Sequence, residues 1–161
     1  RLDPKYMLAH FNMGTAKEAQ GDLHGAISSY EAAIRLDPKD KDAHLNMGNA
    51  KQAQGDLHGA ISSYEAAIRL DPKYMTAHLN MGLAKKAQGD LHGAISSYEA
   101  AIRLDPKYKE AHLGMGAAKQ AQGDLHGAIS SYEATIRLDP KYMLAHFNMG
   151  TAKEAQGDLH G

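Results

Sequence analysis

Apolar and small residues recur at helical spacing along the whole chain. In the segment Leu23–Leu36, apolar side chains fall three or four residues apart, which places them on one stripe of an α-helix. The preceding segment, Met7–Gln20, is rich in Ala, Met, Lys and Gln, all of which favour helix. Gly21-Asp22 separates the two segments. The pattern therefore predicts a helix, a short turn and a second helix.

This unit repeats with a fixed period of 34 residues, because Arg-Leu-Asp-Pro begins at Arg1, Arg35, Arg69, Arg103 and Arg137. A period of this length is typical of stacked supersecondary units that depend on their neighbours for stability. Asp-Pro is expected to end one helix and to start the next, because Asp is a good N-cap and Pro suits the first helical position. We expect one array over 1–161, with the end of a preceding repeat at 1–6, complete repeats at 7–40, 41–74, 75–108 and 109–142, and a partial repeat at 143–161.

The constant residues of the unit resemble the tetratricopeptide repeat (TPR). The matching positions in the first copy are Met13, Gly14, Ala26, Tyr30, Ala33 and Pro38. Two positions depart from the family pattern, since His10 stands where tryptophan is common and Lys17 where tyrosine is common. The resemblance covers nearly all of the chain. It implies an all-α, right-handed α-solenoid of stacked helix-turn-helix repeats with about nine helices, similar to the superhelical repeats of O-linked N-acetylglucosamine transferase.

The copies differ mainly on one stripe of the first helix, whereas the second helix changes only at Thr135. A stack of like units needs like packing faces, so a stripe that varies is predicted to lie outside the packing. In TPR arrays the equivalent stripe lines a concave groove that binds peptides. The resemblance thus implies a peptide-binding groove whose predicted residues are Leu8, Phe11, Asn12, Thr15, Glu18, Asp42, Leu45, Asn46, Asn49, Gln52, Thr76, Leu79, Asn80, Leu83, Lys86 and Asn148.

Asparagine recurs at one place on this stripe and is interrupted by Gly114. A side-chain amide can donate to and accept from an extended peptide backbone, so these residues are candidate peptide contacts. The alternatives are amides that bond neighbouring helices or water, and neutral drift on a solvated face. The carboxylate clamp known in this family is missing, because its lysine place holds Phe11 or Leu and its arginine place holds Asn or Gly114. The mixed apolar and mildly acidic stripe would suit an extended neutral or weakly basic segment.

Composition narrows the partners and the chemistry. The 161 residues carry a formal net charge of −1 and no cysteine, so neither nucleic acid nor a membrane is an expected partner. The 10 histidines form two repeated sets without cysteine, which favours structural roles over a metal site, and no cofactor is expected. A catalytic site is singular, whereas nearly every residue here recurs, so no enzyme activity is expected. We expect an intracellular soluble protein that binds a protein or peptide.

The two ends of the chain have the same sequence, since residues 1–25 are identical to residues 137–161. Recent duplication, a designed or consensus-like array, or a window from a longer polymer would each give this identity. The alternative function is accordingly a designed or recently duplicated scaffold that self-associates head-to-tail without a specific ligand. A regulatory array attached to an enzyme is a third possibility.

Overall fold

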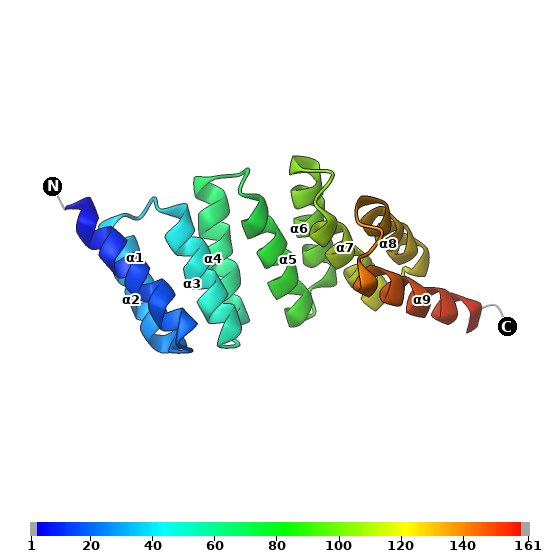
Figure 1. Ribbon diagram of the computed structural model, residues 1–161, viewed down its shortest axis with the longest axis horizontal. Coiled ribbons are helices and arrows are strands. Elements are labelled where there is room, and N and C mark those ends of the chain that lie inside the picture. The colour runs from blue at the N-terminus through cyan, green and yellow to red at the C-terminus, as the bar shows by residue number, and fades with distance from the viewer. Residues whose placement is uncertain (1–2, 159–161) are drawn as a thin grey trace. The chain divides into compact units, whose positions relative to one another are not determined.

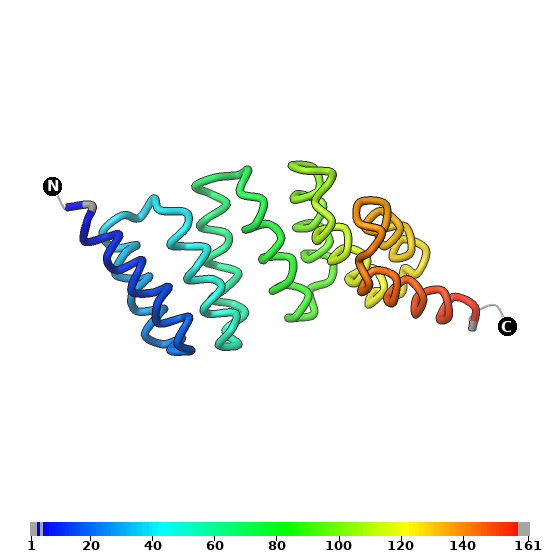
Figure 2. Tube along the Cα trace, viewed as in Figure 1, coloured from blue at the N-terminus to red at the C-terminus, as the bar shows by residue number. Residues whose placement is uncertain are grey.

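The computed structural model describes residues 3–158, and this part of the chain consists of nine α-helices (Figure 1). The first helices at 4–19, 41–53 and 109–122 are each followed after a short turn by a second helix that packs beside them (Figure 2). The helices are α1 (Pro4–Ala19), α2 (Leu23–Leu36), α3 (Lys41–Ala53), α4 (Leu57–Leu70), α5 (Met75–Gln88), α6 (Leu91–Leu104), α7 (Lys109–Gln122), α8 (Leu125–Leu138) and α9 (Met143–Asp158).

The chain divides into two compact units, residues 1–84 and 85–161, and the division falls within α5. In the first unit, α2 packs against both α1 and α3, and α4 packs against α3. In the second unit, α7 packs against α6 and α8, and α8 also packs against α9. α2 and α8 thus each pack against two first helices.

The turn inside each pair follows the sequence prediction. Gly55 adopts φ +88°, a left-handed conformation that glycine reaches without steric cost, and this ends α3. Asp56 then caps α4, because its carboxylate accepts a hydrogen bond from the N–H of Gly59 at 2.9 Å. A Cβ at Gly59 would lie 2.0 Å from that carboxylate, so glycine at this place lets the cap form.

The turn between pairs differs from the prediction. Asp3 and Pro4 do start α1 as expected. Asp37, however, is the C-cap of α2, and Pro38 lies in a turn in which the N–H of Asp40 donates to the Asp37 carbonyl oxygen at 3.3 Å. Asp40 then caps α3. Asp37-Pro38 therefore ends one helix without starting the next, because the turn consumes the residues that would form the first helical turn.

Four buried tyrosines, one on each second helix, form the centres of the core: Tyr30, Tyr64, Tyr98 and Tyr132. Around Tyr64 pack Ala60, Ala67, Ala77 and Ala84, all fully buried. Gly48 of α3 lies so close to this ring that a Cβ would come within 2.6 Å of the Tyr64 Cε1 atom. The small residues of the repeat thus let the helix backbones close around a tyrosine.

Candidate functional site

A polar pocket of about 390 Å³ opens on the first unit, above the hydroxyl of Tyr64. It is lined by Asn49, Gln52 and Ala53 of α3, by Tyr64 of α4 and by Asn80 of α5. Asn49, Gln52 and Asn80 belong to the stripe that varies among the repeats. The tyrosine is constant, and it forms the buried floor beneath them.

The pocket side chains hold one another in place through hydrogen bonds. The Tyr64 hydroxyl lies 2.9 Å from Oδ1 of Asn49 and 2.8 Å from Oε1 of Gln52, and its single hydrogen is shared between these acceptors. Nδ2 of Asn80 donates to the same Asn49 oxygen at 2.9 Å. Burial, assisted by the Glu18 carboxylate, raises the pKa of Tyr64, so its hydroxyl stays protonated and remains a donor.

These bonds leave part of each amide unused. Among the described residues, the side-chain nitrogens of Asn49 and Gln52 and the side-chain oxygen of Asn80 have no hydrogen-bonding partner. The pocket thus offers fixed donors and an acceptor at one surface. A peptide backbone presents the complementary set, an acceptor and a donor in each residue.

The contact from tyrosine to first helix recurs with a fixed spacing of 12 residues. The Tyr30 hydroxyl donates to Glu18 at 2.8 Å, and the Tyr132 hydroxyl donates to Gln120 at 2.7 Å. Nε2 of Gln120 also donates to the hydroxyl of Thr151 on the next first helix, at 3.2 Å. The position of the variable stripe that holds Glu18, Gln52 and Gln120 therefore bonds the core tyrosine as well as facing the surface.

The predicted groove residues differ in exposure. Leu45 is only 7% exposed and belongs to the core around Tyr64, so we leave it out of the candidate site. Phe11 is half-buried, and its ring centroid lies 5.9 Å from that of Tyr30. The exposed members are Leu8, Asn12, Thr15, Asp42, Thr76 and Leu83, and the other half-buried ones are Glu18, Asn46, Asn49, Gln52, Leu79, Asn80, Lys86 and Asn148.

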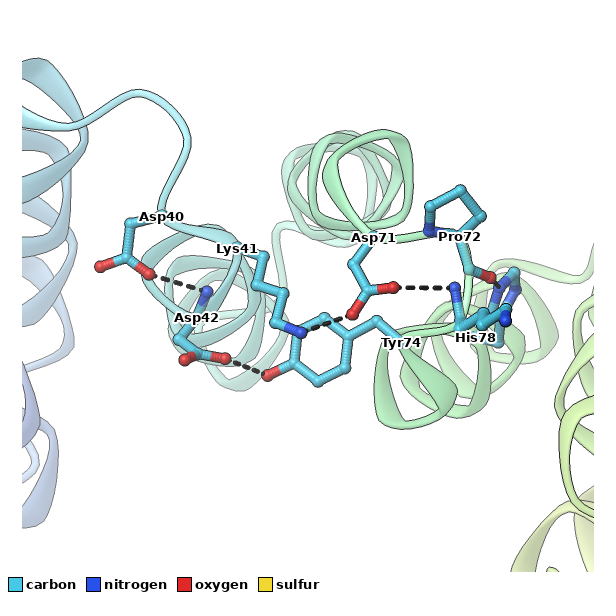
Figure 3. Close-up of polar contacts among 8 residues, drawn as sticks. Asp40, Lys41, Asp42, Asp71, Pro72, Tyr74 and His78 are labelled. Carbon is cyan, nitrogen blue, oxygen red and sulfur yellow. Dashed lines mark hydrogen bonds and ion pairs between the residues drawn. The ribbon is translucent and has the colours of Figure 1, made fainter.

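One further position also varies among the repeats, although it was not predicted to be functional. The first residue of the first helix alternates between methionine and lysine, and both lysines form ion pairs. Lys41 pairs with Asp71 and lies over the ring of Tyr74, 4.8 Å from its centroid (Figure 3). Asp42 accepts a hydrogen bond from the Tyr74 hydroxyl at 2.6 Å. Asp42, predicted as a groove residue, is therefore engaged at the junction between helix pairs.

The repeated histidines have structural contacts. Nε2 of His78 lies 2.9 Å from the carbonyl oxygen of Pro72, and His112 and His146 make the same contact with their preceding prolines at 2.8 Å. This fastens the Asp-Pro turn to the following helix. Within residues 3–158 no group of three potential metal ligands comes together, and no helix is long and apolar enough to cross a membrane.

Solved structures of similar fold include a MamA protein, with a TM-score of 0.88 and 27% identity over 95% of this chain and 84% of that one. A second MamA structure matches with a TM-score of 0.85 and 29% identity, covering 90% of this chain and 85% of that one. The first TPR of Spaghetti (RPAP3), bound to the HSP90 peptide SRMEEVD, has a TM-score of 0.73 and 25% identity. That alignment covers 76% of this chain and 97% of the other. A comparison with curated proteins gave no match.

The sequence also matches the family model of the TPR repeat four times, over residues 17–55, 53–89, 84–123 and 120–157. These matches are consecutive, and they agree with the alternation of first and second helices in the fold. Together they span most of the sequence, and the chain belongs to the tetratricopeptide repeat family.

Proposed function

We propose that this chain is a non-catalytic interaction module and that the polar pocket of the first unit binds an extended peptide segment of a partner protein. The observation that carries the proposal is the set of amide groups at Asn49, Gln52 and Asn80, held by hydrogen bonds yet left with free donors and a free acceptor. Fixed polar groups bind more strongly than mobile ones, because less side-chain entropy is lost on binding.

A peptide is favoured over a small molecule by the openness of the site. The pocket is open and its lining is about equally polar and apolar, whereas sites for small molecules are usually enclosed and mostly apolar. The RPAP3 domain, which this chain resembles at 25% identity, is bound to a peptide in its solved structure. Exposed residues of the same stripe, such as Thr76 and Leu83, would extend the contact beyond the pocket.

The alternative function is head-to-tail self-association. It is supported by exposed apolar side chains on α9, where Met143 is 77% and Phe147 68% exposed, and on α1, where Tyr6 is 66% exposed. Inside each unit, however, a second helix packs on the first helix that follows it, as α2 does on α3 and α8 on α9. A contact between α9 and α1 would join two first helices, which inside each unit touch less than a second helix and the first helix that follows it. Mass measured over a concentration series tests this alternative, and growth with concentration would support it.

The proposal can be tested with peptides selected from a random twelve-residue display library. The affinity of a selected peptide is measured by calorimetry for the wild type and for Asn80→Ala. We expect Asn80→Ala to weaken binding roughly five-fold, the effect of losing a net hydrogen bond of about 1 kcal/mol. Ser62→Ala is the control, because Ser62 is exposed on the second helix α4. Equal affinities of the wild type and Asn80→Ala would contradict the proposed site.

A further inference from the structure

One of the four core tyrosines lacks the hydrogen bond that the others make. Tyr98 is fully buried, and its hydroxyl has no partner among the described residues. The hydroxyls of Tyr30, Tyr64 and Tyr132 each donate to an oxygen of the side chain 12 residues earlier. A buried hydroxyl without an acceptor is destabilising, so its presence in only one pair calls for a physical reason.

The reason lies at position 86. Glu18, Gln52 and Gln120 provide an acceptor at this place of their helices, but the third copy has Lys86. An ammonium group has three donors and no acceptor, so it cannot receive the hydrogen of the Tyr98 hydroxyl. Lys86 is half-buried and has no ion-pair partner among the described residues. In the other copies a tyrosine hydroxyl donates to an acceptor side chain, whereas in the third copy both Tyr98 and Lys86 are donors.

The neighbouring first helix also differs here. Gly114 occupies the place at which the other copies have asparagine. A Cβ on Gly114 would lie 2.7 Å from Cζ of Tyr98 and 3.1 Å from its hydroxyl oxygen, so the hydroxyl is directed at this side-chain-free stretch of α7. The corresponding residue in the preceding copy, Asn80, lines the Tyr64 pocket and donates to its acceptor. Gly114 has no side chain and therefore cannot line a pocket or donate a hydrogen bond as Asn80 does.

We propose that Lys86 and Tyr98, both in the second unit, form a subsite for a carboxylate group of a peptide. The proposal rests on the peptide-binding function above and adds the chemistry of one partner residue. One carboxylate has two oxygens and about four acceptor positions, so it accepts from both the ammonium and the hydroxyl and compensates the charge of Lys86. A neutral amide oxygen would leave the charge uncompensated.

Access requires a local rearrangement, because the Tyr98 hydroxyl is covered in the unbound protein. The rearrangement must expose this hydroxyl beside α7, and the four-carbon stem of Lys86 lets the ammonium follow the anion to it. The subsite is distinct from the carboxylate clamp of the family, whose lysine and arginine places hold no basic residue here. It also makes the third copy an exception to the neutral or weakly basic segment expected from the whole stripe.

The test uses three N-acetylated nine-residue peptides of alternating serine and alanine. The first has a central glutamate and an amidated C-terminus, the second a central glutamine and an amidated C-terminus, and the third a central glutamine and a free C-terminal carboxylate. Binding to the full chain is followed by the ¹H–¹⁵N signals of Gly114 and of the side-chain amides of Asn49 and Asn80. The first and third peptides distinguish a side-chain carboxylate from a terminal one.

We expect a carboxylate peptide to bind roughly ten-fold more tightly than the neutral peptide and to shift the Gly114 signal, as charge-assisted hydrogen bonds imply. Lys86→Gln, which restores the acceptor of the other copies, should abolish the discrimination. Lys107→Gln should retain it, because Lys107 is exposed in the turn after α6. Tyr98→Phe should reduce it.

The outcomes separate the two proposals. Equal affinities of all three peptides for the wild type, or discrimination that survives in Lys86→Gln, would overturn the carboxylate subsite. If the Asn49 and Asn80 signals still shift in that case, the peptide-binding function stands without it. No shift of any of these signals with any peptide would overturn both proposals.

Discussion

The hydroxyl of Tyr132 donates a hydrogen bond to Oε1 of Gln120, 2.7 Å away, and so joins the second helix of a pair to the end of the first. The same bond links Tyr64 to Gln52 and Tyr30 to Glu18. In the described part of the chain the Tyr98 hydroxyl makes no such bond, and the corresponding residue is Lys86. Because the four pairs are otherwise nearly identical in sequence, the chain contains its own controls for the contribution of this bond.

Restoring the acceptor should stabilise the protein. Lys86→Gln is expected to raise the free energy of unfolding by about 1 kcal/mol, because the buried Tyr98 hydroxyl gains the partner that its counterparts have. Denaturant unfolding monitored by circular dichroism measures this. Lys107→Gln removes the same charge from an exposed side chain and should change the free energy by less than about 0.5 kcal/mol. A destabilised Lys86→Gln variant would contradict the assignment.

Removing the hydroxyl should have different effects at two tyrosines. Tyr132→Phe is expected to cost about 1 kcal/mol of unfolding free energy, because Gln120 loses its donor. Tyr98→Phe should be neutral or stabilising, because it deletes an unpaired buried polar group. The two variants make the same chemical change at fully buried sites, so comparing their unfolding midpoints isolates the hydrogen bond. Equal losses in both would show that the bond is not the cause.

Replacing glycine by alanine should have opposite effects at two equivalent places. In Gly48→Ala the new Cβ would lie 2.6 Å from Cε1 of Tyr64, and we expect a loss of about 1–3 kcal/mol from overpacking. In Gly150→Ala the new Cβ would have no neighbour within 4 Å among the described residues, so the helix preference of alanine should stabilise α9 by about 0.5–1 kcal/mol. Thermal unfolding of both variants measures the contrast. A tolerated Gly48→Ala would mean that the helices around Tyr64 pack less closely than described.

The ion pair between Lys109 and Asp139 predicts a pH dependence. Nζ of Lys109 lies 2.6 Å from the carboxylate, and this contact, followed by the Lys141 backbone N–H, lowers the pKa of Asp139 below its ordinary value of 3.8. A lowered carboxyl pKa contributes stability above the unfolded-state pKa, and this contribution is lost as the pH falls through the folded-state pKa.

Lys109→Met, which installs the residue of the alternate copies, should therefore change the melting temperature relative to wild type more favourably at about pH 2 than at pH 7. The apolar gain of methionine acts at both pH values, so the difference between them reports the ion pair. Lys107→Gln should show a smaller difference, because Lys107 is an exposed turn residue with no ion pair to any described residue. The same difference in both variants would contradict a specific pair.

Much of the fold could be predicted, because its determinants repeat. The apolar stripe of Leu23–Leu36 predicted the bounds of α2, and Gly21-Asp22 predicted the turn before it. The role of Asp37-Pro38 was predicted wrongly, because the residues suit an N-cap and a turn equally well and only the three-dimensional path decides between them. The alternation of Met and Lys at the start of the first helix was visible, but its partner Asp71 lies 30 residues further on.

The candidate site was predictable only in part. Variation among copies located the surface that contains Asn49 and Asn80, and the structure adds that these two amides bond each other. The same criterion wrongly grouped Leu45 with the surface residues, because leucine and phenylalanine can exchange within a core as well as on a face. The mismatch of Lys86 with Tyr98 required the knowledge that each core tyrosine reaches back 12 residues, which depends on helix packing.

The most direct test of the central claim is to map a selected peptide onto the protein by NMR. The account predicts that the largest shifts fall on the side-chain amides of Asn49, Gln52 and Asn80, the groups with unused donors and acceptors at the polar pocket. Shifts confined to the outer face of α4, at Ser62, Glu65 and Arg69, would contradict it, because these exposed residues are the same in every copy of the second helix.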